Sequence, residues 1–179
     1  MLHSELYFDR LAAAYVRGML RSSEAYPDYS AYDTTRFEVI VLAGLPGVGK
    51  DAWIRQCGCD LPVISLDALR TELSIPPDKP QGRVIAAAKQ RARELLRIDQ
   101  GFIWNATNIT RSLRQQLIDL FTAYRARVRI VYLDAAYPKL LRRNRARTHS
   151  VPEKIIASLA AKLDLPDVTE AHTVDYVTN

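Results

Sequence analysis

Residues 37–51 read FEVIVLAGLPGVGKD, and this stretch decides the fold. Residues 37–43 form an apolar run typical of a buried strand. The residues that follow fit the pattern Gly-x-x-x-x-Gly-Lys of a phosphate-binding loop, except that Asp51 stands where Ser or Thr is usual. A strand before the loop and a helix after it are the context that this motif requires. The stretch therefore predicts a site for a nucleoside triphosphate.

The loop is expected to hold phosphate oxygens mainly with its backbone. Glycines at its first, fourth and sixth positions allow backbone angles closed to other residues, so successive N–H groups can converge on one anion. Pro46 has no N–H, which leaves the amides from Gly47 onward. Lys50 would bridge the β- and γ-phosphates, and the following helix would point its positive end at them. The expected nucleotide-binding residues are Gly44, Leu45, Pro46, Gly47, Val48, Gly49, Lys50 and Asp51.

Apolar runs alternate with helical patterns along most of the chain. The β-rich runs suit buried parallel strands. The alternation predicts an α/β fold, a doubly wound parallel sheet of about five strands with ligands at the carboxyl ends of the strands. Strands are expected at 37–43, 62–66, 102–106, 128–133 and 173–177, and helices at 49–57, 67–73, 80–98, 111–124, 137–147 and 152–163.

The first 35 residues differ from the rest in pattern. Residues 3–20 show the helical spacing of apolar side chains, and residues 22–35 contain a proline, three tyrosines and many polar residues. The second segment is typical of a linker or arm. We therefore expect an N-terminal helix and arm over residues 1–35 and a phosphate-loop domain over residues 36–179.

Composition is that of a globular chain. Its 179 residues are 48% hydrophobic, enough for one well-buried domain plus an appendage. The sequence has no apolar run of transmembrane length, so no membrane partner is expected. Cys57 and Cys59 flank one glycine without a second cysteine pair, which favours free thiols over a metal site. Free thiols indicate a reducing, cytoplasmic location.

Asp67 follows the strand expected at 62–66. A carboxylate at the carboxyl end of a strand, across from a phosphate loop, is well placed to accept a proton from an attacking hydroxyl. Arg70 lies three residues on, on the same helical face, and could hold an anionic part of the acceptor. The alternative for Asp67 is that it merely caps the next helix.

The third expected strand ends in a polar cluster, Asn105, Thr107 and Asn108. Asn105 and Thr107 are two residues apart and therefore share a face. Their amide and hydroxyl groups could orient metal-bound waters or the acceptor. Thr107 and Asn108 are the candidates for contact with the acceptor. The alternative is that Asn108 or Thr110 caps the following helix.

Four arginines lie within six residues after the fourth strand. Two of them, Arg143 and Arg147, are four apart and share a face of the helix expected at 137–147. This is the layout of a helical lid. Mobile guanidinium groups on such a lid can neutralise the charge of a loose phosphoryl-transfer transition state. The alternative is a solvated helix face. Beside a phosphate-binding site, contact with anions is favoured.

In order, the motifs are GLPGVGK, SLDALR, ATN and RNRAR, the last followed by VP. This ordered set resembles the polynucleotide 5′-hydroxyl kinases, which include the phage enzyme and the kinase modules of bacterial RNA repair proteins. The likeness is strongest to the kinase half of bacterial HD-Pnk proteins, in which an HD-type phosphohydrolase precedes the kinase. It covers most of the chain and includes the Tyr-Pro-Asp-Tyr arm.

The resemblance implies a role for each matching residue. Lys50 would hold the β- and γ-phosphates, Asp67 would be the general base for the 5′-hydroxyl, and Arg70 would contact the phosphate next to the acceptor nucleoside. Arg143 and Arg147 would be lid residues on the donor phosphates. The implied cofactors are ATP or another NTP and Mg²⁺ or Mn²⁺, and the implied partner is a 5′-OH end of RNA or DNA. An HD domain would precede the N-terminal helix in the full-length polypeptide.

Two positions depart from the family's pattern. Many relatives have Ser or Thr in place of Asp51, and many have Asp at or beside the position of Asn105. We expect that the carboxylate has moved across the metal, so that the charge around Mg²⁺ is unchanged. Asp51 and Asn105 are then the candidate metal ligands, directly or through water. The alternative is that Asp51 caps the helix after the loop.

Three functions compete. The first is NTP-dependent phosphorylation of a polynucleotide 5′-hydroxyl, which the ordered motifs favour. The second is a small-metabolite P-loop kinase, whose acceptor pocket should be closed and neutral and should not need Arg70. The third is a nucleotide-binding adaptor without catalysis, against which Asp67 argues.

Overall fold

The computed structural model describes residues 34–147 and 150–178. The chain divides into two units, Met1–Thr34 and Thr35–Asn179. The second unit contains the phosphate loop and all the elements described below. The helix expected at 3–20 and nearly all of the arm expected at 22–35 lie outside the described residues.

The described residues form a five-stranded parallel sheet with the strand order β2-β3-β1-β4-β5. The strand that leads into the phosphate loop, β1, lies at the centre of this sheet and is hydrogen-bonded on both sides. The predicted doubly wound parallel sheet is confirmed. The strands are β1 (Phe37–Ala43), β2 (Val63–Ser65), β3 (Phe102–Asn105), β4 (Ala126–Asp134) and β5 (Thr173–Thr178).

Each helix expected within the described residues is present, with ends that differ from the expectation by a few residues. The largest difference is at the last helix, which ends at Ala160 rather than at residue 163. None of the described helices is long and apolar enough to cross a membrane. The helices are α3 (Lys50–Gln56), α4 (Leu66–Glu72), α5 (Gly82–Arg97), α6 (Arg111–Thr122), α7 (Tyr137–Arg145) and α8 (Glu153–Ala160).

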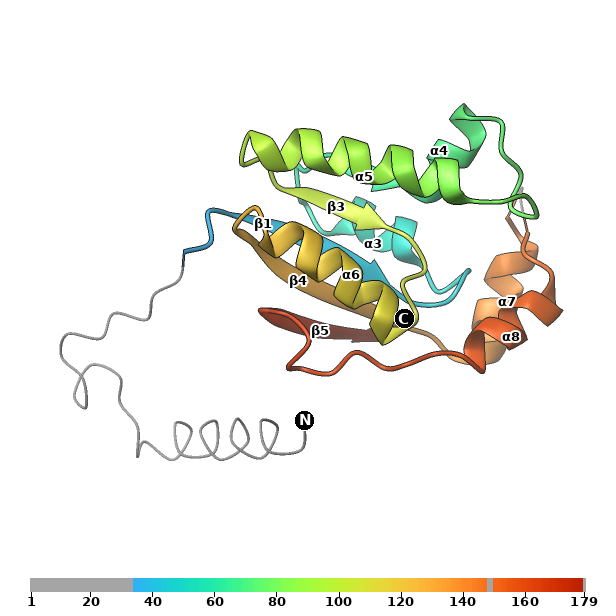
Figure 1. The fold of residues 1–179 in the computed structure, drawn as a ribbon. Coiled ribbons are helices and arrows are strands. Elements are labelled where there is room, and N and C mark those ends of the chain that lie inside the picture. The colour runs from blue at the N-terminus through green and yellow to red at the C-terminus, as the bar shows by residue number, and fades with distance from the viewer. Residues whose placement is uncertain (1–33, 148–149, 179) are drawn as a thin grey trace, which may run out of the picture. The chain divides into compact units, whose positions relative to one another are not determined.

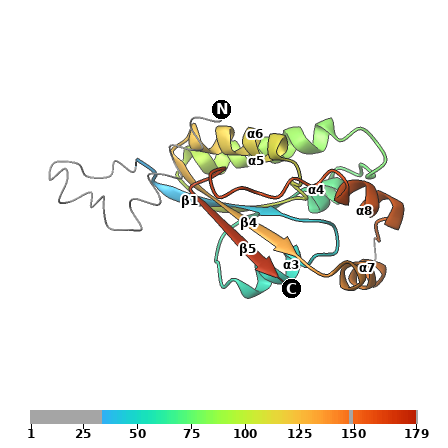
Figure 2. The ribbon, with the colours of Figure 1, turned by 90° about the horizontal axis from the view of Figure 1, so that it is seen from below.

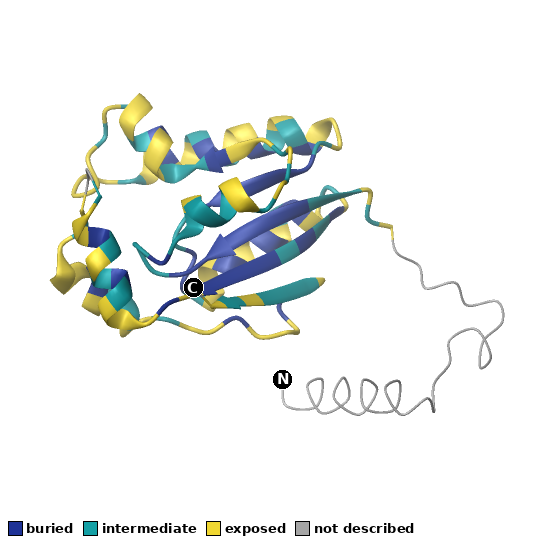
Figure 3. Cartoon of the chain, turned by 180° about the vertical axis from the view of Figure 1, so that it is seen from behind, coloured by how far each residue is buried: buried dark blue, intermediate teal, exposed yellow. Residues whose placement is uncertain are grey.

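Helices cover both faces of the sheet. Helices α5 and α6 lie on one face and α3 lies on the other (Figure 1, Figure 2). Along β1, Val39 and Val41 belong to the core under α5 and α6, whereas Ile40 and Leu42 belong to the core that includes residues of α3. Since side chains alternate along a strand, a strand covered on both faces must be apolar throughout. Figure 3 shows the resulting band of buried strands between exposed helix surfaces.

The carboxyl ends of the strands meet at one edge of the sheet. Because the strands are parallel, the phosphate loop after β1, Asn105 at the end of β3 and helix α4 after β2 gather there. The register places Asn105 level with Leu42 and with Ser65 in the two neighbouring strands. Helices α7 and α8 lie at the same edge (Figure 1). This edge carries the candidate site.

Candidate active site

The phosphate loop depends on glycine at several positions. Gly44, Gly47 and Gly49 have positive φ angles of 140°, 82° and 110°. A Cβ atom at Gly44 would lie 2.5 Å from the carbonyl oxygen of Leu133, and one at Gly47 would lie 2.9 Å from that of Leu140. The loop is therefore packed tightly against the end of β4 and against α7, and a side chain there would be both strained and in collision.

Lys50 begins α3 and folds back over the loop. Its Nζ donates hydrogen bonds to the carbonyl oxygens of Gly44, at 2.8 Å, and Leu45, at 3.0 Å. Burial lowers the pKa of Lys50 to about 8, although the nearby carboxylates of Asp51 and Asp67 act in the opposite direction. The ammonium group thus lies at the loop with neutral carbonyl partners, where the charge of a phosphate would stabilise it further.

Asp51 and Asn105 are in direct contact. The Asn105 Nδ2 donates a hydrogen bond to the Asp51 Oδ1 at 2.9 Å. The cap residue of α3 is Gly49, which makes no side-chain cap bond, and Asp51 lies in the first turn of the helix. Asp51 therefore does not cap this helix. The two positions that depart from the family's pattern are neighbours in space.

Asp67 lies in the first turn of α4 beside Arg70. The cap residue of this helix is Ser65, whose Oγ accepts a hydrogen bond from the Ala68 amide at 3.3 Å, so the capping alternative for Asp67 is wrong. The Asp67 carboxylate instead contacts the Arg70 guanidinium group. The Arg70 Nε donates to the Gln81 Oε1 at 2.7 Å. The Asp67 side chain keeps 71% of its surface exposed, so its carboxylate is accessible to an acceptor.

The two predicted lid arginines approach different parts of the site. Helix α7 ends before Arg147, which corrects the expectation that both residues share one helical face. The Arg143 Nη1 donates to the carbonyl oxygen of Val48 in the phosphate loop at 3.1 Å. The Arg147 Nη2 lies 3.8 Å from an Asp51 carboxylate oxygen and 3.7 Å from an Asp67 oxygen. Arg147 therefore links the carboxylates on the two sides of the site.

Of the other predicted acceptor residues, Thr107 lies at the site and Asn108 does not. Thr107 lines the pocket described next, and its carbonyl oxygen accepts a hydrogen bond from the Gly44 amide at 2.9 Å. The buried Asn108 side chain donates to the carbonyl oxygen of Leu42 at 2.7 Å. Its amide thus ties the loop after β3 to the end of β1. Thr110, rather than Asn108, caps α6.

A small pocket joins these elements. Its volume is about 60 Å³, and it lies between the phosphate loop, the end of β3 and helix α4. It brings the predicted phosphate-binding lysine together with the predicted general base and the predicted acceptor arginine. The residues that line it are Lys50, Leu66, Asp67, Arg70, Asn105, Ala106 and Thr107.

Gln81 is a residue of the site that the sequence did not indicate. Its Oε1 accepts from Arg70, and its Nε2 donates to the carbonyl oxygens of Pro76, at 2.9 Å, and Lys79, at 2.7 Å. It therefore fixes Arg70 against the turn that leads into α5. A glutamine between helices carries no motif from which this role could be read.

Arg114 was not predicted from the sequence either, although the sequence contains a signal for it. Its side chain is fully buried, and it makes two hydrogen bonds to the Glu170 carboxylate, at 2.7 and 2.8 Å. Its Nη1 also donates to the carbonyl oxygens of Asn108 and Asp164. Arg114 thus holds the loop after β3 from behind. It stands on the apolar stripe of α6, where a charged residue indicates a buried ion pair.

The sequence also matches a known protein family. The model of the AAA_33 family, described as an AAA domain, matches residues 39–166. The chain belongs to this family. The match runs from β1 to a point beyond α8 and so contains every predicted site residue from Gly44 to Arg147.

The similar proteins include two kinases and a chain of an RNA repair complex. The L-seryl-tRNA(Sec) kinase of Methanococcus maripaludis is 23% identical over 147 residues, which are 78% of this chain and 58% of that protein. The chain thus spans less than two thirds of that relative. A gluconokinase from Sinorhizobium meliloti 1021 is 25% identical with a TM-score of 0.55, covering 79% of this chain and 82% of that one. A chain of the Pnkp1/Rnl/Hen1 RNA repair complex is 23% identical with a TM-score of 0.62, covering 75% and 47%.

Family and fold together make the chain a P-loop kinase, a nucleotide-binding phosphotransferase. Kinases of this kind use a nucleotide together with a divalent metal, generally Mg²⁺. The described residues contain no group of three or more His, Cys, Asp or Glu side chains that could hold a metal ion. Kinase sites hold Mg²⁺ with one or two carboxylates plus phosphate oxygens and waters. Asp51, with the Asn105 amide beside it, is a donor set of that kind.

Proposed function

We propose that this kinase transfers the γ-phosphate of ATP or another NTP to the 5′-hydroxyl end of RNA or DNA. The observation that carries the proposal is the contact between Asp67 and Arg70 in the pocket that Lys50 also lines. A carboxylate and a guanidinium group side by side suit an acceptor that presents a hydroxyl next to a phosphate. The 5′ end of a polynucleotide is such an acceptor.

On the acceptor side, Asp67 acts as the general base. Its exposed carboxylate takes the proton of the 5′-hydroxyl as the oxygen attacks the γ-phosphorus. The bond from the γ-phosphorus to the β-phosphate oxygen breaks, and the nucleoside diphosphate leaves. Arg70, held by Gln81, binds the phosphate on the 3′ side of the first nucleoside through a charge-assisted hydrogen bond. Because Arg70 already contacts Asp67, one bound phosphate brings the hydroxyl toward the base. Thr107 adds a polar wall to the same pocket.

On the donor side, Lys50 leaves the loop carbonyls for the β- and γ-phosphates, and Arg143 and Arg147 neutralise the charge of the transferring group. Asp51 and Asn105 would hold Mg²⁺, directly or through water, and the metal would supply neutralisation of the phosphate charge. Asn108 takes no part in the proposed acceptor contacts, since its side-chain amide donates a hydrogen bond to the Leu42 carbonyl oxygen in β1.

The ordered motifs and the likeness to a chain of the RNA repair complex support this proposal. The proposal includes a place in nucleic acid repair. The resemblance to HD-Pnk proteins adds an HD phosphohydrolase domain in the full-length polypeptide, and the two free cysteines favour the cytoplasm. A second candidate is a small-metabolite kinase. The 25% identity to a gluconokinase over 82% of that chain favours it. A metabolite kinase does not need an arginine that selects an acceptor phosphate.

The experiment is transfer of labelled γ-phosphate from ATP to a panel of acceptors. The panel contains a 5′-OH oligonucleotide, a nucleoside 3′-phosphate, the bare nucleoside and gluconate. We expect the first two acceptors to be used far better than the nucleoside, and Arg70→Ala to remove most of that advantage. Phosphorylation of gluconate in preference to the oligonucleotide would establish the second candidate. Equal use of nucleoside and nucleotide would contradict the role of Arg70.

A further inference from the structure

Helix α5 carries a row of arginines on its solvent side. Its buried residues recur every four positions from Val84 to Leu96 and face the core. At 3.6 residues per turn, Arg83, Arg93 and Arg97 fall together on the opposite side. Arg83 and Arg97 are exposed and Arg93 is half-buried. These three residues are called the α5 arginine row below.

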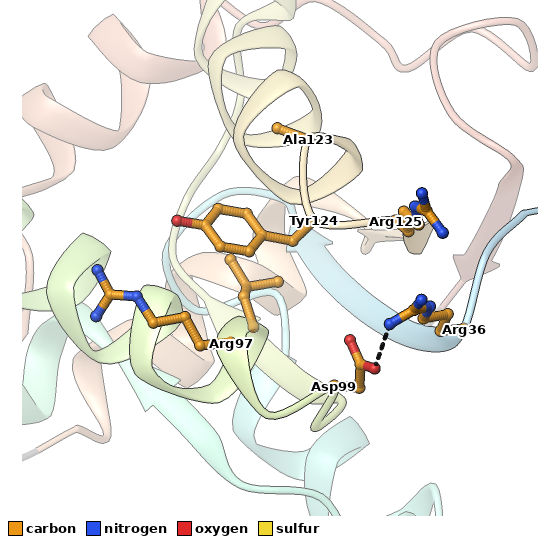
Figure 4. Close-up of a pocket in the computed structure, with 7 residues that line it drawn as sticks. Arg36, Arg97, Asp99, Ala123, Tyr124 and Arg125 are labelled. Carbon is orange, nitrogen blue, oxygen red and sulfur yellow. Dashed lines mark hydrogen bonds and ion pairs between the residues drawn. The ribbon is translucent and has the colours of Figure 1, made fainter.

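The row ends in a basic hollow at the far edge of the sheet. The hollow has a volume of about 350 Å³ and is formed by the residue before β1, the end of α5 and the turn after α6. Figure 4 shows Arg36, Arg97 and Arg125 around it, with the Tyr124 ring among them. Arg36 is paired with Asp99 at 3.0 Å. In the described part of the chain, neither Arg97 nor Arg125 has a carboxylate within ion-pair distance.

Helix α5 connects this hollow to the acceptor pocket. Its first residue follows Gln81, the side chain that holds Arg70. Its last residue is Arg97, in the hollow. Figure 1 shows α5 running along the sheet between α4 and the edge where β1 begins. At 1.5 Å per residue the 16 residues of α5 span about 24 Å. Arg83 stands at the end near the acceptor pocket, and Arg93 and Arg97 stand in the half that ends at the hollow.

We propose that the α5 arginine row and the basic hollow bind the single-stranded continuation of the acceptor, on the 3′ side of its reacting end. This inference rests on the proposed function and adds to it a second contact region for the polynucleotide. Guanidinium groups along the helix contact the phosphate backbone. The half-buried Tyr124 ring packs against the core and lines the hollow, where its exposed part contacts a base. The helix length accommodates several nucleotides between the reacting end and the hollow.

The charges favour an extended polyanion over a small anion. The row and the hollow together contain five arginines, and the nearby acids are Asp99, held by Arg36, and Glu94, which accepts a hydrogen bond from Gln90 at 3.0 Å. A single phosphate would use one or two of these arginines, whereas a strand that follows α5 uses them in sequence. An arginine row alone is usually a solvated helix face. Here the helix that carries the row lies between two pockets, one of which contains the proposed base.

The test is the dependence of phosphorylation on acceptor length. A 5′-OH dinucleotide reaches only the acceptor pocket, whereas an oligomer of about ten nucleotides reaches the hollow as well. For the parent enzyme we expect a KM at least about tenfold lower for the oligomer than for the dinucleotide, and a steeper loss of oligomer binding with salt. The double variant Arg97→Gln/Arg125→Gln should lose most of this difference and leave dinucleotide phosphorylation unchanged. Its salt slope should fall by about one per phosphate contact removed.

Arg55→Gln is the matched control. Arg55 is an exposed arginine in the last turn of α3, on the other face of the sheet, and its loss should leave the length dependence intact. An unchanged length dependence in the double variant, or an equal fall in the control, overturns the inference. So does a parent enzyme that uses both acceptors equally, and the proposed function then still stands. A parent that phosphorylates neither acceptor refutes the proposed function itself.

Discussion

The side-chain amide of Asn105 donates a hydrogen bond to Asp51 at 2.9 Å and so joins the end of β3 to the first turn of α3. In the polynucleotide kinases that the chain resembles, the loop more often has a hydroxyl and the strand end an acid. Here the loop has the acid and the strand end the amide. An exchange of the carboxylate across one metal ion requires both positions to lie within reach of that ion, and their contact shows that they are neighbours.

The exchange is tested by a double-mutant cycle. Asp51→Ala should raise the Mg²⁺ concentration needed for half-maximal rate and slow transfer, because one carboxylate ligand is lost. Asn105→Asp in that background should recover part of the loss. The measurement is the Mg²⁺ dependence of kcat for the four enzymes, with Asp60→Ala, an exposed acid beyond α3, as control. Strictly additive losses would contradict the exchange.

Replacement of the proposed base should affect chemistry and not nucleotide binding. Asp67→Asn keeps the shape of the side chain and removes its basicity, so kcat should fall by about 10² or more. ATP affinity should barely change, because Asp67 lies outside the phosphate loop, in the proposed acceptor pocket. Steady-state kinetics with saturating acceptor separate the two effects. A variant that binds ATP poorly but transfers normally at saturation would place Asp67 in the donor site.

The lowered pKa of Lys50 predicts a pH dependence of nucleotide binding. Burial brings the pKa from 10.5 to about 8, so the free enzyme loses the ammonium charge as the pH rises above about 8. A bound phosphate raises the pKa again, and binding above that pH must take up a proton. ATP affinity should then fall by up to about tenfold per pH unit.

Calorimetry in buffers of different ionisation enthalpy measures the affinity for ATP and the proton uptake that accompanies ATP binding. Lys50→Arg is the control, because its guanidinium group stays charged and its affinity profile should be flat over the same range. A flat profile in the parent enzyme would show that Lys50 remains charged without nucleotide.

The lid arginines should depend on their planar, forked shape. Arg143→Lys and Arg147→Lys keep the charge but lose the paired N–H donors, so transfer should fall by about tenfold or more at one or both positions. Arg142→Lys, an exposed neighbour, is the control. The readout is single-turnover transfer with ATP bound, since lid contacts tighten with nucleotide. Full activity of the double lysine variant would reduce the cluster to a general basic surface.

The buried pair of Arg114 and Glu170 should dominate the stability of the loop behind the site. Arg114→Ala leaves a buried carboxylate without its partner and should cost about 3–5 kcal/mol in the free energy of unfolding. The exposed pair of Arg91 and Glu72 is the control, and Arg91→Ala should cost about 0–1 kcal/mol. Urea titration measures both losses. Similar losses at the two arginines would contradict the assigned burial.

The sheet and the phosphate loop could be predicted because their signals are local. The run from Val39 to Ala43 is apolar on both faces, and the glycine spacing after it restricts the backbone to one kind of turn. Helix ends were less predictable. The lid helix stops before Arg147 although the sequence pattern continues, because the end of a helix depends on the contacts around it.

The structure was needed to decide whether three polar residues cap helices or belong to the site. Asp67, Asn108 and Asp51 are all residues that cap helices well, and sequence alone leaves both roles open. Ser65 caps α4 and Gly49 precedes α3, which frees both aspartates for the site. The Asn108 amide, by contrast, does not serve the site, because it donates a hydrogen bond to the Leu42 carbonyl oxygen inside the fold.

By itself the sequence determined a P-loop kinase fold and predicted a donor site at residues 44–51, because a strand, a glycine loop and a lysine act through neighbouring residues. Only the tertiary structure decided which distant side chains meet. Asn105 and Asp51 are 54 residues apart, and Arg114 and Glu170 are 56 apart. Their contacts depend on strand order and register, which set Asn105 level with Leu42 at the edge where the loop begins. Register depends on the packing of both faces of the sheet, and no local pattern contains it.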